Sequence, residues 1–143
     1  LRTEGYRENK MKKILGIIAW AILTASPVFA GDPSNGIWKT AVSEETGSWL
    51  HVKVYDCDGL ICGEILDAYT SDGKISEDYE HKGKPIIWNM QINGDGTYKK
   101  GKIWNPTNDK TYSSKMALDG TSLDVSGCVW GLCQAQTWER VSD

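Results

Sequence analysis

From residue 36 to residue 141, short runs of alternating hydrophobic and polar residues are separated by glycine, asparagine and aspartate. The alternation is clearest at Leu50, Val52 and Val54, where His51 and Lys53 occupy the positions between them. Such alternation is typical of β-strands with one buried and one solvated face, and this region shows no convincing helical period. The pattern predicts eight strands, at about residues 36–42, 48–57, 61–70, 84–92, 96–105, 110–118, 121–129 and 132–141.

A second alternating run predicts the orientation of the strand at 84–92. Ile86, Trp88, Met90 and Ile92 recur at every second position. Because successive side chains of a strand point to opposite faces, all four are expected on the buried face.

The segments between the predicted strands carry the residues that tight hairpins need. Asp58-Gly59, residues 93–96 and Asp119-Gly120 supply backbone positions with positive φ at little steric cost. Only residues 71–83 break the rhythm, since they are polar and too numerous for a hairpin turn. We expect a flap or a single helical turn there.

The two ends of the strand region predict a closed sheet. Gly36 and Trp38 open the first strand, and Arg140 lies in the last. A guanidinium over an indole gains about 0.5 to 2 kcal/mol, so Arg140 is expected to lie across Trp38 and join the first strand to the last. The sequence therefore predicts an all-β fold, an eight-stranded antiparallel up-and-down β-barrel, with a β-sandwich as the alternative.

Residues 11–30 have the composition of a secretory signal peptide. Met11 and two lysines precede an apolar run of 12 residues, and small residues follow it up to Ala30. The run is shorter than the roughly 20 residues that a transmembrane helix needs. We expect residues 1–10 to be an upstream extension, 11–30 a cleaved signal peptide, and 31–143 a single domain in the periplasm or outside the cell, with no stable membrane insertion.

Composition narrows the range of partners. Residues 31–143 contain 11 Lys and Arg against 17 Asp and Glu, a balance of −6. An acidic balance argues against nucleic acid or an anionic membrane surface as a partner. Nothing in the sequence predicts an oligomeric state.

Four cysteines form two units of equal spacing, Cys57 with Cys62 and Cys128 with Cys133. Each unit spans a predicted hairpin turn, which places its two sulfur atoms on one face. In an exported protein this favours disulfides, and of the three possible connectivities we expect Cys57–Cys62 and Cys128–Cys133. A four-cysteine zinc site is the alternative, since the number of ligands is right.

Candidate catalytic residues are few. The histidines after residue 30 are His51, on a predicted solvated face, and His81, in the polar 71–83 segment, and no Gly-x-Ser-x-Gly or His-Glu-x-x-His motif occurs. Four acidic residues surround the first cysteine unit without the spacing of an EF-hand, and we expect solvated charges there: Asp56, Asp58, Glu64 and Asp67. The sequence predicts no enzymatic activity, no cofactor and no metal.

An eight-stranded barrel either is filled by its own side chains or holds one small ligand. The expected ligand is a small apolar or amphipathic molecule, oriented by inward Ser114, Gln134 and Gln136. The residues expected on the inner wall are Leu50, Val52, Val54, Ile65, Tyr69, Trp88, Met90, Tyr112, Ser114, Met116, Gln134 and Gln136. The alternative is a filled barrel whose outer aromatics, Trp49, Tyr55 and Trp130, bind a protein or glycan of the envelope.

An ordered set of motifs resembles a bacterial family. The motifs are CDGLICGEI at 57–65, GKIWNP at 101–106, KTY at 110–112, LDVSGC at 123–128 and LCQAQTWER at 132–140. Together they resemble the family called domain of unknown function 2147 over nearly all of 36–140. The resemblance implies export and a lipocalin-like barrel, without a known activity. Gly36-Ile37-Trp38 is also similar to the opening motif of lipocalins, whereas their middle Thr-Asp-Tyr motif is not found.

Overall fold

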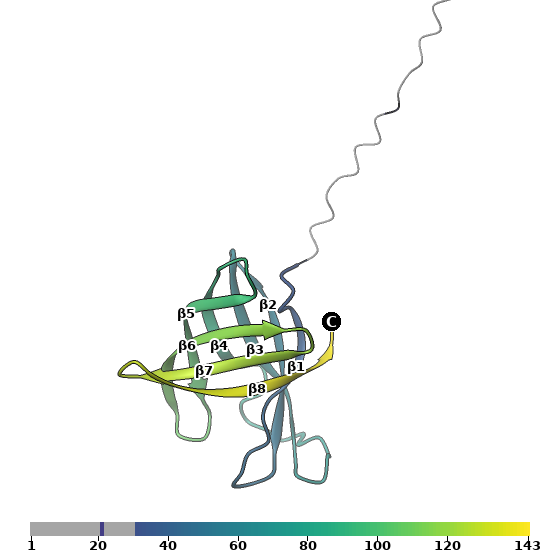
Figure 1. The fold of residues 1–143 in the computed structure, drawn as a ribbon. Helices are drawn as coiled ribbons and strands as arrows, with labels where there is room; N and C mark the ends of the chain where they lie inside the picture. The colour runs from purple at the N-terminus through teal and green to yellow at the C-terminus, as the bar shows by residue number, and fades with distance from the viewer. Residues whose placement is uncertain (1–20, 22–30) are drawn as a thin grey trace, which may run out of the picture.

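A computed structural model describes residue 21 and residues 31–143. Eight strands follow one another as neighbours in a closed antiparallel barrel (Figure 1). They are β1 (Gly36–Lys39), β2 (Trp49–Cys57), β3 (Leu60–Tyr69), β4 (Pro85–Ile92), β5 (Thr97–Asn105), β6 (Lys110–Asp119), β7 (Ser122–Val129) and β8 (Leu132–Ser142). The predicted barrel is confirmed and the sandwich is wrong. The predicted signal peptide and upstream extension lie outside the described residues, apart from residue 21.

Strand β1 ends three residues earlier than predicted, at Lys39. The side-chain hydroxyl of Thr40 accepts the hydrogen bond of Leu50 N at 3.0 Å, in place of a backbone carbonyl. Thr40 N still donates to Leu50 O at 2.9 Å. The regular ladder therefore stops here, and residues 40–48 form a loop.

The segment between β3 and β4 is a series of tight turns. Tyr79 N donates to Ser76 O, Lys82 N to Tyr79 O and Lys84 N to His81 O, each spanning three residues. No helix forms anywhere in residues 31–143, so the helical turn considered for 71–83 is wrong. Within the described part of the chain, no helix is long and apolar enough to cross a membrane.

Arg140 joins the two ends of the sheet. It pairs with Trp38 in the β1–β8 register, and its Cζ atom lies 4.3 Å from the centroid of the indole. Its guanidinium donates to Asn35 O at 2.8 Å and to Pro33 O at 2.5 Å. Gly36 has φ +137°, and a Cβ there would lie 2.5 Å from Ser142 O, so only glycine fits where β1 meets β8. The contact expected between the first and last strands is present.

Both disulfides form as predicted, Cys57–Cys62 in the β2–β3 hairpin and Cys128–Cys133 in the β7–β8 hairpin. Cys128 and Cys133 pair directly across the hairpin, with Cα atoms 4.0 Å apart. No free cysteine remains, and a four-cysteine zinc site is therefore wrong.

Irregular pairing shifts the alternation in the middle of the barrel. Asn89 and Lys100 have φ values of 57° and 56°, and both lie between the pairs Trp88–Lys102 and Gln91–Lys99, where the β4–β5 ladder is interrupted. Ile87 pairs with Ile103 in the interior, so the next pair, Trp88 and Lys102, faces outward. The inward position expected for Trp88 is wrong, because one extra residue per strand at this bulge reverses the faces.

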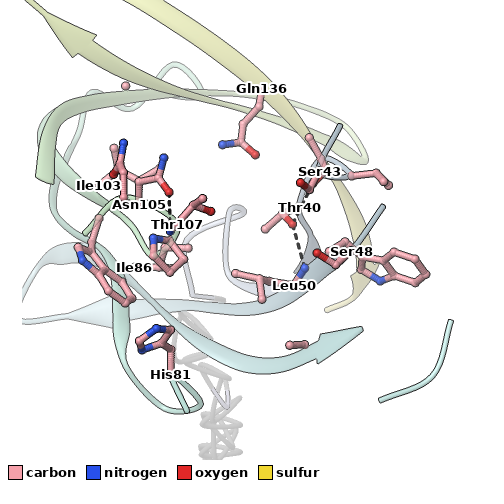
Figure 2. A pocket seen from close by; sticks show the side chains of 18 of the residues that line it. Thr40, Ser43, Ser48, Leu50, His81, Ile86, Ile103, Asn105, Thr107 and Gln136 are labelled. Atoms are coloured by element: carbon pink, nitrogen blue, oxygen red, sulfur yellow. Dashed lines mark hydrogen bonds between the residues drawn. The ribbon is translucent and has the colours of Figure 1, made fainter. Parts of the chain in front are cut away.

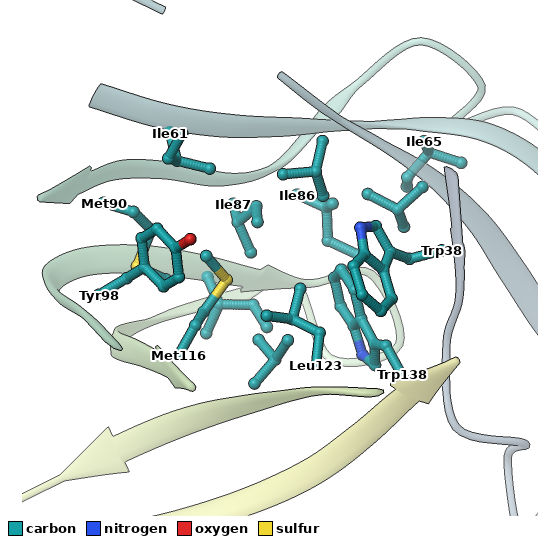
Figure 3. Packing of buried hydrophobic residues seen from close by; sticks show 14 residues of the cluster. Trp38, Ile61, Ile65, Ile86, Ile87, Met90, Tyr98, Met116, Leu123 and Trp138 are labelled. Atoms are coloured by element: carbon teal, nitrogen blue, oxygen red, sulfur yellow. The ribbon is translucent and has the colours of Figure 1, made fainter. Parts of the chain in front are cut away.

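The interior has a filled half and an open half. The open half lies at the end formed by residues 40–48, 70–84, 106–109 and 130–131 (Figure 2). Toward the opposite end the interior is packed with buried hydrophobic side chains (Figure 3). The packed set includes Trp38, Val52, Val54, Ile61, Ile65, Ile87, Met90, Tyr98, Met116, Leu123 and Val125. One half of the interior is therefore filled by its own side chains, and the other encloses space that they do not fill.

Candidate functional site

A cavity of about 1520 Å³ occupies the open half of the barrel and its wide mouth (Figure 2). Typical pockets for small molecules measure roughly 300 to 1,000 Å³, so this space exceeds what one such molecule needs. The lining comes from the barrel strands and from the loops that surround the mouth.

The deep wall of the cavity is apolar. Leu50, Ile86, Ile103 and Trp138 line it, and the last three are buried in the hydrophobic core as well. Ile86 reaches the interior because the β3–β4 register shifts between Gly63 and Glu64, which leaves an extra residue in β4. The wall therefore offers apolar contact area on a rigid base.

Polar side chains of β8 reach into the same space. Gln134 and Gln136 pair with Gly127 and Val125 of β7, so both face the inside of the barrel. In Figure 2 the amide of Gln136 points into the cavity. Neither amide hydrogen-bonds another described residue, and the cavity is wide enough to leave both side chains exposed. These amides are free to donate to or accept from a bound molecule.

The indole of Trp138 also lacks a polar partner. Trp138 is fully buried at the base of the cavity, and its Nε1 atom forms no hydrogen bond within the described part of the chain. An unsatisfied buried donor costs about 1 to 3 kcal/mol.

The loop between β5 and β6 is held by its own side chains. Asn105 Oδ1 accepts from Thr107 N at 2.9 Å and Asn108 Oδ1 from Lys110 N at 3.0 Å. Asn108 also donates to the hydroxyl of Tyr112 at 2.9 Å, and Trp104 Nε1 donates to Asp109 at 2.8 Å. This side of the mouth is thus ordered before any ligand arrives.

Three aromatic rings edge another side of the mouth. The ring of His81 lies 5.4 Å from Tyr79 and 5.0 Å from Trp104, both edge to face. His81 Nδ1 accepts a hydrogen bond from Lys84 Nζ at 3.0 Å, and Nε2 lies 3.3 Å from Glu80. Burial, aided by the charge of Glu80, raises the pKa of Tyr79 above its usual value. The turns of the 70–84 segment and strand β5 thus place a fixed aromatic row at the entrance.

The twelve side chains expected on the inner wall occupy four different places. Leu50, Tyr112, Gln134 and Gln136 line the cavity. Val52, Val54, Ile65, Met90 and Met116 belong to the packed half, and Ser114 is buried with its hydroxyl unpaired by any described residue. Tyr69 reaches the cavity only at its rim, and Trp88 faces outward.

Tyr69 leaves the interior because of another register shift. His51 pairs with Asp67 but Val52 pairs with Ile65, so Leu66 is the extra residue in β3. Ala68 is therefore inward, and the ring of Tyr69 stacks on outward Trp49 at 5.5 Å. The inward orientation expected for Tyr69 is wrong for this reason.

Sequence reasoning missed part of the lining. The missed residues include Thr40, Ala68, Tyr79, His81, Ile103, Asn105 and Trp138. Trp138 lies two residues after Gln136 in the same strand, and this spacing alone could have added it to the wall. Ala68 depends on a bulge, and Tyr79 and His81 on an irregular segment, which alternation does not reveal.

The outer aromatics differ sharply in exposure. Trp130 is 97% exposed at the tip of the β7–β8 hairpin, where Trp130 and Gly131 have φ values of 54° and 77°. Leu132 beside it is 80% exposed, and the tip projects from the barrel in Figure 1. Trp49, by contrast, is partly covered by Tyr69 and by Lys39, whose Nζ lies 4.4 Å from its ring centroid. Within residues 31–143, only the hairpin tip presents a freely exposed indole.

The candidate ionic and catalytic residues do not converge on one site. Asp56 accepts a hydrogen bond from Asn35 at 2.9 Å, and Asp67 pairs with Lys82 at 2.9 Å. Partial burial lowers the pKa of His51, which lies on the outer face against Tyr69. Among the described residues, no group of three or more His, Cys, Asp or Glu is placed to hold a metal ion.

The fold matches a solved structure from another bacterium, described as "Protein HP1028 from the human pathogen Helicobacter pylori belongs to the lipocalin family". The two chains superpose with a TM-score of 0.60 at 20% sequence identity, over 76% of this chain and 83% of that chain. At this identity the likeness establishes a shared lipocalin-like fold. No curated protein matches the chain.

A family model matches residues 36–140, which are the whole barrel from β1 into β8. The family is described as "Uncharacterized protein conserved in bacteria" (domain of unknown function 2147). The resemblance carried by the cysteine and tryptophan motifs is confirmed over the same residues. This chain belongs to that bacterial family, with a lipocalin-like barrel as its fold.

Proposed function

We propose that this protein binds a small apolar or amphipathic molecule in the open half of its barrel. The observation that carries the proposal is the cavity itself, whose base is apolar and whose β8 wall presents two unpaired glutamine amides. Apolar walls with a few convergent polar groups are typical of small-molecule sites. The lipocalin-like fold supports the same function.

The protein acts as an exported binding protein rather than as an enzyme. Two disulfides support an oxidising compartment, the periplasm or the exterior, reached after cleavage near Ala30. His81 of the cavity lining lies beside Glu80 and Lys84, but it forms no hydrogen bond to a described hydroxyl or thiol that could act as a nucleophile, so the proposal assigns no catalytic step.

Direct binding measurements test the function. We expect N-phenyl-1-naphthylamine, an uncharged apolar dye, to gain fluorescence on mixing with the purified domain and to be displaced by monolaurin. Native mass spectrometry of the protein as purified should show a co-purified small molecule. Absence of dye binding together with absence of any bound molecule would contradict the proposal.

Gln136→Leu tests the hydrogen bond between the Gln136 amide and a ligand head separately from the apolar contacts of the ligand tail. Loss of one hydrogen bond to a ligand head is worth about 1 kcal/mol, so monolaurin should bind about fivefold more weakly while the dye is unaffected. Gln91→Leu is the matched control, because Gln91 is exposed on the outer face of β4, opposite Lys99. Equal effects of the two substitutions on monolaurin would show that Gln136 does not contact the head.

A second candidate function is docking to an envelope glycan or protein through the β7–β8 tip. Trp130 favours it, because a 97% exposed indole contributes nothing to the core or to the cavity base. The disulfide Cys128–Cys133 holds this tip, so little conformational entropy would be lost on docking. Co-sedimentation with isolated peptidoglycan, abolished in Trp130→Ser, would support the glycan form of this candidate.

A further inference from the structure

The charged groups around the cavity are all of one sign. Glu45 of the 40–48 loop and Asp78 and Glu80 of the 70–84 segment line it. No described lysine or arginine does so, although 11 of these basic residues occur in residues 31–143. A ligand in the cavity therefore faces carboxylates and no free cation of the wall.

The lysines close to the mouth are engaged by other groups. Lys84 donates to His81 and lies 5.8 Å from the centroid of Trp104, and Lys82 pairs with Asp67 at 2.9 Å. Lys39 lies over the ring of Trp49. Each of the three ammonium groups therefore already has a partner within the protein.

His81 is held between a lysine and a carboxylate. A lysine ammonium can only donate a hydrogen bond, so Nδ1 of His81 accepts it. Nε2 lies 3.3 Å from Glu80. Both ring nitrogens are therefore engaged by groups of the protein.

The deeper polar groups are uncharged. Gln134 and Gln136 offer amides at the inner wall. A carboxylate or phosphate head placed among them would lose hydration without gaining an ion pair, which is costly. Three carboxylates nearer the entrance would add like-charge repulsion.

We propose that the cavity selects amphiphiles whose head is uncharged or cationic and discriminates against carboxylate and phosphate heads. This inference rests on the proposed ligand-binding function and specifies its ligand class. Cationic heads gain two further contacts at the entrance, attraction to the carboxylates and access to the aromatic row Tyr79, His81 and Trp104. The Lys84 ammonium already lies near the Trp104 ring in this way.

Three amphiphiles with the same twelve-carbon acyl or alkyl chain test the selection. Laurate, monolaurin and dodecyltrimethylammonium are compared below their micellar concentrations as competitors of N-phenyl-1-naphthylamine, at pH 7.5 and 0.15 M salt. We expect laurate to need at least about tenfold more ligand for half-displacement than either of the other two. Laurate displacing the dye as well as monolaurin does would overturn the inference and leave ligand binding intact.

Two variants with the same change in net charge test whether discrimination against laurate arises at the mouth of the cavity. Glu45→Lys places a cation at the mouth, and Asp119→Lys makes the same change in net charge in the β6–β7 hairpin, at the opposite end of the barrel. Both positions are exposed, so neither variant is expected to affect folding. With a Debye length near 8 Å, Glu45→Lys should strengthen laurate binding by about two- to threefold and Asp119→Lys should not. Equal strengthening of laurate binding by both variants, or none by Glu45→Lys, would contradict selection at the mouth.

Failure of the dye and of all three amphiphiles to bind would instead refute the proposed function.

Discussion

Arg140 connects three parts of the molecule through one side chain. It lies over the Trp38 ring, donates to two carbonyl groups of residues 33–35, and belongs to the last strand. Arg140→Ala should reduce the free energy of unfolding by about 1 to 3 kcal/mol, because the aromatic contact, the hydrogen bonds and the packing of the stem are all lost. Arg140→Lys should recover only part of this free energy of unfolding, since a lysine has no planar face to stack and no fork of donors. Urea denaturation measures both, and an unchanged midpoint in Arg140→Ala would contradict the assigned role.

Tyr98 makes stability depend on pH in the alkaline range. Burial, and next the hydrogen bond to Asp32 at 2.5 Å, raise the pKa of Tyr98 to about 12. A folded-state pKa above the unfolded value of about 10 means that this contribution is complete below pH 10 and is lost as pH rises toward 12.

Tyr98→Phe tests this contribution. The variant should be less stable by about 1 to 2 kcal/mol at pH 8, because a hydrogen bond to a carboxylate is removed. The difference from the native protein should shrink between pH 10 and pH 12. Urea unfolding of both proteins at several pH values measures it, and a constant difference across that range would contradict the assigned pKa.

At the scale of the elements, removing the two disulfides one at a time distinguishes an effect on stability from an effect on ligand binding. Each closes a short loop and is worth about 2 kcal/mol in the chain-entropy model. Replacing either pair by serine should therefore lower stability by similar amounts. Only Cys133 lines the cavity, so loss of Cys128–Cys133 should also weaken dye binding, with the Cys57–Cys62 double variant as control. Equal dye affinity in the two double variants would show that the Cys128–Cys133 disulfide does not shape the cavity wall.

The strands themselves were largely predictable, and the wall was only partly so. Turn residues such as Asp58-Gly59 and the alternation of Leu50, Val52 and Val54 specify strands locally, and seven of the eight strands differ from expectation by at most one residue at either end. The errors at Tyr69 and Trp88 follow from single extra residues near Leu66 and Asn89. A bulge reverses the inward or outward orientation of the side chains that follow it in the strand, and no residue type in these strands indicates one.

At the scale of the whole molecule, the barrel divides into a half that stabilises it and a half available to a ligand. Trp38, Tyr98 and Met116 fill one half, and residues 31–35 are tied to that half by Trp38 and Arg140. The other half leaves glutamine amides and a buried indole donor without partners among the described residues. Because burial in the first half does not depend on occupancy of the second, the protein is expected to remain folded when empty.

This division predicts where a ligand changes backbone dynamics. Saturation at about 100 times Kd stabilises the native state by about 2.7 kcal/mol, which slows amides that exchange through global unfolding. Amides that exchange by local opening should slow only near the ligand, so protection by monolaurin should appear at Ser43, Thr70 and Tyr79, whose backbone bonds hold the loops around the mouth.

The matched control amides lie in the hairpins of the filled half. Asn93 N donates to Thr97 O at 3.0 Å in the β4–β5 turn, and Leu118 N, near the end of β6, donates to Gly96 O of that turn at 2.7 Å. Their exchange should be the same with and without monolaurin, because no ligand atom reaches them. Hydrogen exchange followed by mass spectrometry resolves both sets of peptides in one experiment. Protection confined to the filled-half hairpins would place the ligand at the wrong end of the barrel, and equal protection of both sets would mean that binding acts only through global stability.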